Sequence, residues 1–598
     1  MKAKTHGLIL LHGIPKIYEG ENMRPINLKI TIKLLTPFHV GGIPGEDANV
    51  SYILRDADQK AYYPGTAFKG KTRHFASLYQ KETCLFPAQC SCRICRLFGG
   101  EGNARGSLIF SDLNPNEVMD AYYRTGNTLD PYRRVAEDGK LFSIESDASR
   151  ELIGHITGTA NDDDVAFLIK SIKQIQQIGG NTSRGLGWID GEIDVTEEPI
   201  FPKKANDPIV SKKIAKCVSI KVIPKSPLLI GTHTTESNFR DTKLTIPGSV
   251  IRAALARAIC EQDGNKSIDS EDENGSYILP VEGVTNFPNL RKVFSELRFN
   301  ELTPKVQSEP YPMSMRKCKN NSSHKKVDIL AAMLNKSFDM KCEDCNDRLA
   351  KIDAYEDFTD AESATITVTS MHSGIDKYRG TAKDELLFSI RALAPNTGIN
   401  GVEFCGNITG DVDLDELNIL CRTPLHIGAM ITKGFGECDV VFNEISIPDD
   451  NKMQDRIIKF NELIHKDKKI INDVFHDAPL LVPITLMSDA IVDIAEPKDG
   501  KYLEAYSSII KPFKLIHIIT KHRYTRGYDT RGSKEKRKDV RLVMQAGSVL
   551  VLQVDNLDVA TIDMLKKIEA EGIGSETNDG YGAIRVAYFR HFEDALKN

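Results

Sequence analysis

The string G-x5-G-x-G occurs three times in this chain of 598 residues, and the repeat constrains the fold more than any other feature. The copies are GGNTSRGLG (179–187), GAMITKGFG (428–436) and GSETNDGYG (574–582), each followed by a short strand-like run. Glycine permits positive φ and a close backbone approach, so one copy alone is explained by a hairpin with structural glycines. Three copies with matched spacing favour a repeated fold, although they do not by themselves establish ligand binding.

The segments upstream of the first two copies also match each other. An alternating strand (28–42 or 217–231) leads to Pro-Gly and then to Thr66 or Ser249, which are good helix N-caps. A helix N-terminus with nearby cations suits phosphate, and a plain crossover helix with a solvated basic face explains the pattern equally well. The candidate RNA-binding cations on these two helices are Lys69, Lys71, Arg73 and Arg252.

The third region starts more weakly, at 479–492, but again gives a strand, a helix, a glycine loop and a strand. The sequence therefore predicts an α+β protein of three related units: 1–205, 214–448 and 476–598. A polar, charged stretch at about 262–370 is predicted as an insertion in the second unit.

Four cysteines, Cys84, Cys90, Cys92 and Cys95, fall within twelve residues. The spacing Cys92-x-x-Cys95 is typical of a zinc knuckle. For the other two ligands we favour His74 and Cys84, with Cys90 as the rival. Four unrelated reduced thiols are the alternative.

A second cluster, Cys318, His324, Cys342 and Cys345, lies in the polar insertion. That segment has little apolar content for a core of its own, so a bound zinc would supply folding free energy. Both clusters have enough protein ligands to be closed, which predicts structural zinc at two sites.

The net charge of −5 excludes a protein coated with basic groups but not one concentrated basic groove. The stretch 521–541 contains nine Lys or Arg and three Asp or Glu, a net +6, with tyrosines interleaved. Guanidinium and aromatic planes stack on unpaired bases, so Arg523, Arg526 and Arg531 are predicted RNA contacts. A solvated basic loop is the alternative.

The glycine loops supply further candidates. Backbone N–H groups at Gly179 and Gly180 could line a phosphate or ribose. Arg184 and Lys433 occupy equivalent positions in loops one and two, whereas loop three has Asp579 there. We therefore expect the third loop not to grip phosphate as the others do.

No apolar stretch approaches the roughly 20 residues of a membrane span. The N-terminal apolar run is also shorter than a secretory signal requires. These features predict a cytoplasmic protein without a membrane partner.

The order of several strings resembles the repeat-associated mysterious proteins (RAMPs) of CRISPR systems, whose units are ferredoxin-like (RRM-like). The first unit is similar to the backbone subunit of type III effectors (Cas family seven) through TPFHVGG, YYPGTAFKGKTR, CRLFG, SLIFSDL, KLFSIE and IGGNTSRGLG. The rest resembles the type III-D tag-capping subunit (Cas family five) through LTIPGSVIRAALA, YPMSMRKCK, CEDC, HSGIDKYRGTAKDELLFSI, AGSVLVL and GIGSETNDGYG.

The resemblance implies a backbone–cap fusion that binds the 5′ tag and the start of the spacer of a CRISPR RNA (crRNA) in an antiviral ribonucleoprotein. Its implied partners are crRNA, target RNA, a large signalling subunit and further backbone subunits. Zinc at the first cluster agrees with it.

Two kinds of RNA cleavage enter with the resemblance. Backbone RAMPs use a loop Asp for metal-assisted cleavage of target RNA, a reaction for which Mg²⁺ is the candidate cofactor. Here the usual position falls on Val50, so Asp47 is the candidate and Glu46 its rival, against a solvated turn carboxylate. The alternative function is an endoribonuclease that processes precursor crRNA, for which His39 and His372 are available.

Overall fold

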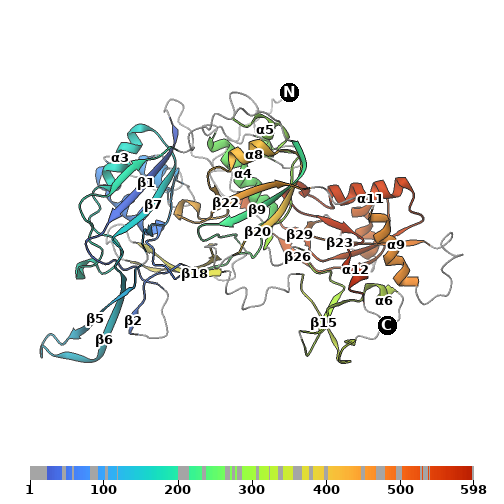
Figure 1. Cartoon of the computed structure of the whole chain (residues 1–598), viewed down its shortest axis with the longest axis horizontal. Coiled ribbons are helices and arrows are strands. Elements are labelled where there is room, and N and C mark those ends of the chain that lie inside the picture. The colour runs from blue at the N-terminus through green and yellow to red at the C-terminus, as the bar shows by residue number, and fades with distance from the viewer. Residues whose placement is uncertain are drawn as a thin grey trace, which may run out of the picture.

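The computed structural model is an α+β structure, as the sequence predicts, and its three largest sheets follow one another along the long axis (Figure 1). It describes residues 23–42, 49–56, 59–80, 90, 92–100, 106–117, 119–199, 214–231, 238–262, 270–271, 277–278, 286–304, 309–321, 323–334, 341–354, 367–375, 382–395, 402–445, 452–465, 479–492, 502–525, 528–529, 536–537 and 539–595. We call each sheet, with the helices packed on it, a unit.

The first unit is an antiparallel sheet of order β3-β7-β1-β8. Its elements are β1 (Arg24–Lys33), α1 (Gly65–Tyr79), α2 (Arg93–Phe98), β3 (Leu108–Phe110), β4 (Asn114–Pro115), β7 (Glu151–Ala160), α3 (Asp162–Ile172) and β8 (Asp194–Glu197). Strand β1 alternates buried apolar and half-buried residues, and its apolar face packs with α1 and α3 in one core. The first strand lies between the third and fourth, which is the ferredoxin-like topology.

The second unit repeats this order as β13-β20-β9-β22-β21. Its elements are β9 (Ile214–Pro224), α4 (Gly248–Gln262), β11 (Ser270–Glu271), β12 (Tyr277–Ile278), α5 (Pro288–Val293), β13 (Arg298–Phe299), β14 (Thr303–Pro304), β20 (Phe404–Asp413), α8 (Leu414–Leu420), β21 (Leu425–His426) and β22 (Glu437–Glu444). The α5, β13 and β14 segments lie within the stretch predicted as an insertion but belong to this unit's core.

The third unit has the order β25-β30-β23-β31. Its elements are β23 (Leu480–Leu486), α10 (Tyr502–Ser507), β25 (Lys514–Ile519), β30 (Val549–Val554), α11 (Val559–Glu571), β31 (Ile584–Val586) and α12 (Arg590–Glu593). The helix α9 (Lys452–His465) precedes β23 and packs on it.

Each unit also has a β-hairpin between its second and third core strands, which the sequence did not reveal as a repeat. The three hairpins form small sheets of order β2-β6-β5, β10-β19-β18 and β24-β29-β26. The strands are β2 (Val50–Ser51), β5 (Ala121–Leu129), β6 (Ala136–Asp147), β10 (Phe239–Arg240), β18 (Thr367–Ile375), β19 (Ala382–Leu393), β24 (Ala490–Ile491), β26 (His522–Thr525) and β29 (Arg541–Met544), with the short pair β27 (Tyr528–Asp529) and β28 (Lys536–Arg537) inside the third hairpin. The β5–β6 hairpin projects away from the first sheet (Figure 1).

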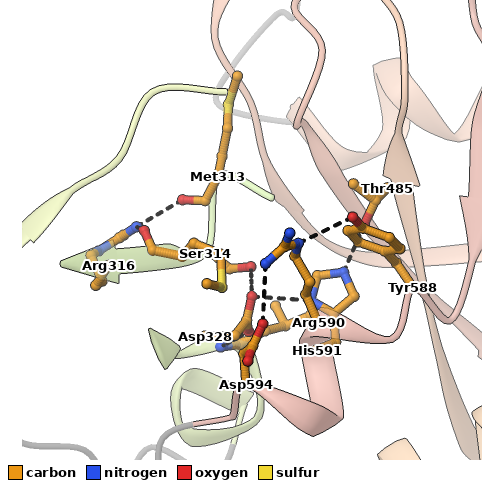
Figure 2. Close-up of polar contacts among 11 residues, drawn as sticks. Met313, Ser314, Arg316, Asp328, Thr485, Tyr588, Arg590, His591 and Asp594 are labelled. Carbon is orange, nitrogen blue, oxygen red and sulfur yellow. Dashed lines mark hydrogen bonds and ion pairs between the residues drawn. The ribbon is translucent and has the colours of Figure 1, made fainter. Parts of the chain in front are cut away.

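The Cys/His segment of the second unit lies against the third unit (Figure 1). Its elements are β15 (Met315–Cys318), β16 (Val327–Asp328), α6 (Leu330–Leu334) and β17 (Leu349–Lys351). A fully buried network holds it there (Figure 2). The His591 ring lies between Asp328 Oδ2 at 3.2 Å and Thr485 Oγ1 at 2.7 Å, and Ser314 donates to the same Asp328 oxygen. The segment is therefore a fixed part of the third unit's surface.

Candidate nucleic-acid interface

The three glycine loops have the same backbone conformation. Each contains a left-handed residue, a 3-10 turn and a left-handed glycine: Asn181 to Gly185, Met430 to Gly434 and Glu576 to Gly580. The φ angle of the first residue is 55°, 59° and 56°, and that of the closing glycine is 88°, 89° and 89°. The spacing of the repeat is therefore a conformational requirement.

The last glycine of each loop has a second reason to lack a side chain. A Cβ on Gly187, Gly436 or Gly582 would lie 1.9, 2.0 or 1.8 Å from the carbonyl oxygen nine residues earlier. Gly179 also has no room, because its Cβ would lie 2.3 Å from His39 O, and Gly180 N donates to that oxygen at 2.7 Å. The N–H of Gly180, a predicted RNA contact, is therefore engaged within the protein. The glycines thus fix the loop against the segment that follows the first core strand.

In the first unit, an open groove of about 600 Å³ lies between the glycine loop and the middle of the β5–β6 hairpin. Asn181 and Arg184 line it from the loop, and Lys140 and Phe142 line it from β6. The exposed Arg184 guanidinium lies 5.0 Å from the centroid of the Phe142 ring. A cation and an aromatic ring thus meet in a concave surface, an arrangement suited to a phosphate and an adjoining base.

A buried polar cluster supports the hairpin base beneath this groove. Glu145 accepts hydrogen bonds from Arg55 Nη2 at 2.7 Å and from Ile53 N at 2.9 Å. Burial alone would raise the pKa of Glu145, but these two partners hold it below its ordinary value. His39 is also buried: its Nδ1 lies 2.7 Å from Glu145 O and its Nε2 lies 3.3 Å from Ser51 Oγ.

The second unit repeats the meeting of loop and hairpin with different side chains. Lys433 is exposed on the loop, and the Arg240 guanidinium lies 5.9 Å from the Phe388 ring on β19. His372 lies against Phe388, with ring centroids 5.4 Å apart. Partial burial and the nearby Lys433 charge lower the pKa of His372 to about 4, so its ring is neutral at pH 7. His372 Nε2 lies 2.9 Å from Ser370 Oγ.

Two of the predicted RNA-binding cations point elsewhere. Arg252 is fully buried, and its Nη1 donates to Asp579 Oδ1 of the third loop at 2.8 Å. Lys69 is 9% exposed and donates from Nζ to Thr432 O of the second loop at 2.8 Å. Both side chains therefore hold the units together, and neither presents its charge to RNA. The pairing with Arg252 also explains the carboxylate at position 579.

Lys71 and Arg73 remain half-buried on α1, and burial lowers the pKa of Lys71. Arg523 is exposed on the third hairpin, but it is ion-paired with Asp489. Tyr524 beside it is 74% exposed. The predicted Arg526, Arg531 and Asp47, with its rival Glu46, lie outside the described residues.

The second predicted metal cluster is assembled. One ligand atom from each of Cys318, His324, Cys342 and Cys345 lies within 4.8 Å of the others. The Cys318 and Cys345 sulfurs are 3.5 Å apart, and Cys342 Sγ lies 3.4 Å from His324 Nδ1. A tetrahedral zinc with the usual bond lengths would place two thiolates roughly 3.7 Å apart and a thiolate and an imidazole roughly 3.6 Å apart. The residues fit such an ion.

The electrostatics of this cluster also favour a cation. Burial raises the pKa of Cys318, but backbone N–H groups of Asn320 and Asn321 lower it, to about 7. The backbone N–H of Asp347 lowers the pKa of Cys345, whereas burial and the adjacent thiols raise it to about 12. The thiols therefore oppose one another's ionisation, and a divalent metal would relieve that repulsion.

The first cluster brings together Cys90, Cys92 and Cys95, again within 4.8 Å. It thus contains Cys90, the rival ligand. His74 is exposed on α1, beside the Phe75 ring, and is not among the clustered residues. Cys84 lies outside the described residues. Burial raises the pKa of the Cys92 thiol, but hydrogen bonds from Gln80 and Cys95 outweigh it and lower the pKa to about 7.

Among the helices of the described part of the chain, none combines the length and apolar character that a membrane crossing requires. No curated protein matches the chain. The family model of the RAMP superfamily matches residues 31–190, a span that runs from β1 through α1 and the β5–β6 hairpin to just beyond the first glycine loop. The groove of the first unit therefore lies within the span that this family model matches.

Proposed function

We propose that the chain is a guide-RNA-binding subunit of a CRISPR type III (III-D-like) effector complex. The observation that carries this proposal is the groove of the RAMP-matched unit, where the Arg184 guanidinium lies beside the Phe142 ring. A similar arrangement of cations and an aromatic ring occurs in the second unit, with Lys433, Arg240 and Phe388. Two such sites in one row suit a single-stranded RNA that passes from one unit to the next.

We further propose that residues 1–205 form a backbone-type unit and that 214–448 and 476–598 form the cap, all three being RAMP units. The shared strand order of the three core sheets supports this division. The third loop has different chemistry, because Asp579 pairs with Arg252 and Glu576 pairs with Arg541 at 2.6 Å. The loop itself contains no Lys or Arg to attract a phosphate, so the guide is bound by the first two loops.

The β5–β6 hairpin is the proposed element between guide and target. Tyr122, Tyr123 and Tyr132 are 51%, 54% and 95% exposed. Leu129 and Leu141 add apolar exposed surface at 58% and 60%. Exposed aromatic rings on a projecting hairpin suit insertion beside a base pair and stacking on the bases that border it.

For the metal clusters we propose structural zinc. The four-ligand set of the second cluster would hold a closed zinc that fixes β15 and β17 against the third unit. At the first cluster, Cys90, Cys92 and Cys95 would supply three ligands, and Cys84 remains the proposed fourth. Measurement of two zinc ions per chain by native mass spectrometry would support both assignments.

Cleavage of target RNA by the first unit stays a proposal, with Asp47 as its carboxylate and Mg²⁺ as its ion. Gly42 and Asn49, the described residues on either side of 43–48, both line the groove. The test is cleavage of guide-complementary RNA by the assembled complex, with Asp47→Ala expected to abolish it and Glu46→Ala as the matched control. Equal cleavage by Asp47→Ala would exclude the role.

The RNA-binding proposal is tested by the salt dependence of guide-RNA affinity. Replacing Arg184 or Lys433 with Ala should lower affinity and reduce the slope of log K against log salt by about one each. The matched control is Lys567→Ala, an exposed lysine on α11 that is paired with Glu571. Unchanged affinity and slope in both loop variants would contradict the proposal.

A further inference from the structure

A cavity of about 310 Å³ lies between the first and second units. One wall is the face of the first sheet that points away from α1 and α3, where Asn27 of β1, Thr157 of β7 and Ile109 of β3 are cross-strand neighbours. The other wall is formed by the C-terminal part of α4 and by β21. None of the described residues that line the cavity belongs to a glycine loop or a hairpin, so it is separate from the proposed RNA path.

Contacts between the two units hold the walls at a fixed spacing. Lys69 Nζ of the first unit donates to Thr432 O of the second at 2.8 Å. Gly434 lies so close to the first sheet that a Cβ on it would be 2.8 Å from Phe110 O. The cavity is therefore a built part of the interface between the units.

The residues that line the cavity include hydrogen-bond acceptors without a donor. Asn27 Oδ1 and Gln262 Oε1 belong to opposite walls, and both are buried without a hydrogen-bond partner among the described residues. The Gln262 amide is oriented by its nitrogen, which donates to Leu420 O at 3.0 Å, so the oxygen is the end that lacks a partner. Ser107 Oγ is a third such atom. A buried polar atom without a partner costs about 1–3 kcal/mol, so the site favours a ligand with N–H or O–H donors.

The charges of the lining residues favour a cation. Glu261 and Glu437 line the cavity, and Arg257 is the one lysine or arginine among the described residues that do so. Arg257 Nε lies 3.7 Å from the Glu261 carboxylate. Glu437 has no ion pair among the described residues, because the nearby Lys225 is paired with Asp439 at 3.0 Å. A phosphate or carboxylate ligand would therefore meet an unpaired negative charge, whereas a cation would supply its counterion.

The ionisation of two carboxyls at the interface agrees with this. Burial, with a further contribution from Asp439, raises the pKa of Glu437. Burial also raises the pKa of Asp112, a residue of the first unit, to about 7, and the Glu437 charge adds to that rise. The two carboxyls therefore oppose each other's ionisation across the interface, and a cation beside Glu437 would lower both pKa values.

The size and the apolar surface of the cavity define the rest of the ligand. At the roughly 30 Å³ that one water occupies in the liquid, the cavity holds about ten non-hydrogen atoms. Ile109, Ala258 and Leu425 give it apolar surface, and no Phe, Tyr or Trp ring is among its described lining residues. We propose that this cavity binds a small aliphatic amine in its protonated form, with the ammonium group at Glu437 and a further donor at Asn27 or Gln262. The site is independent of the proposed RNA function.

The test is calorimetric titration of the full chain, without RNA, with 1,5-diaminopentane at pH 7. The comparator is 1,5-pentanediol, which keeps the length and the donors but carries no charge. We expect saturable binding of the diamine at one site per chain and at least tenfold weaker binding of the diol, because charge-assisted hydrogen bonds are the stronger ones. Equal affinities for the two compounds, or no saturable binding of the diamine, would overturn the proposal.

Two variants place the ligand in the cavity. Glu437→Gln removes the negative charge and should weaken diamine binding at least tenfold. Asn27→Leu removes an acceptor at similar volume, so it should weaken binding without lowering the thermal midpoint, and it decides the outcome if Glu437→Gln does not fold. The matched control is Glu571→Gln, an exposed carboxylate on α11, which should bind the diamine as the wild type does. Wild-type affinity in a folded Glu437→Gln or in Asn27→Leu, or equal weakening in Glu571→Gln, would overturn the proposal.

Discussion

The ion pair between Arg252 and Asp579 gives a sharp test of how the units are joined. The Arg252 side chain is fully buried, that of Asp579 is 19% exposed, and the two charged groups are 2.8 Å apart. Removing one partner of a buried pair costs about 3–5 kcal/mol, because the other charge stays buried without its counterion. Since Asp579 is partly exposed, we expect Asp579→Asn to lower the free energy of opening this contact by about 2–4 kcal/mol.

Substitution of the arginine partner should destabilise the contact less. Arg252→Met removes the buried charge, retains much of the apolar stem and leaves a carboxylate that reaches water, so we expect about 1–2 kcal/mol. The double variant should be more stable than Asp579→Asn alone, because neither charge then remains in the contact. This order of stabilities distinguishes a buried pair from an exposed one.

Hydrogen exchange measured on peptides from 248–262 and 574–582 gives the free energy of opening at this contact. A loss of about 2–4 kcal/mol corresponds to exchange that is roughly 30- to 700-fold faster in Asp579→Asn. Arg252→Met should leave the salt slope of guide-RNA binding unchanged. Exchange at the wild-type rate in Asp579→Asn would show that the ion pair does not stabilise the contact. A reduced salt slope in Arg252→Met would show that Arg252 contacts RNA.

Three further predictions concern the metal, the loop and the hairpin base. Cys342→Ser should lower the zinc content by one ion per chain and make 309–354 sensitive to protease. An unchanged zinc content by elemental analysis would contradict the proposed zinc site. Gly436→Ala should lower the thermal midpoint by several degrees, since its Cβ would lie 2.0 Å from Ile427 O. The control Gly191→Ala meets no atom within 4 Å, so its thermal midpoint should fall only by the effect of positive φ on a residue with a side chain. The pKa of Glu145 is depressed, so its pairing with Arg55 stabilises the fold above the ordinary pKa of 4.5 and is lost as pH falls through the lower folded value. The thermal midpoints of wild type and Glu145→Gln should therefore differ at pH 7 and converge once the pH falls below the depressed folded pKa of Glu145. Parallel curves across this range would contradict the pairing.

The repeat and its spacing were readable in the sequence because they are set by local backbone geometry. The glycines of the three loops need positive φ or lack room for a Cβ, and these requirements leave a fixed pattern in the chain. The grouping of Cys318, His324, Cys342 and Cys345 could also be predicted, because Cys-x-x-Cys is a local spacing that brings two thiols to one point.

The contacts that Lys69 and Arg252 make could not be predicted from the sequence. Their partners Thr432 and Asp579 lie 363 and 327 residues away in sequence, so a basic helix face that suits phosphate served contacts between units instead. The hairpins were missed as a repeat because their strands lack a common sequence pattern. Most of β5 is exposed, and it therefore has no alternation of apolar and polar residues to mark it.

In the proposed function, guide RNA follows the glycine loops and hairpins of the first two units. Ultraviolet cross-linking of bound guide RNA, with the linked peptides identified by mass spectrometry, tests it directly. We expect cross-links in 121–147, 179–187 and 428–436 and none in the helix 248–262. Cross-links confined to 248–262 or to the third loop at 574–582 would contradict it.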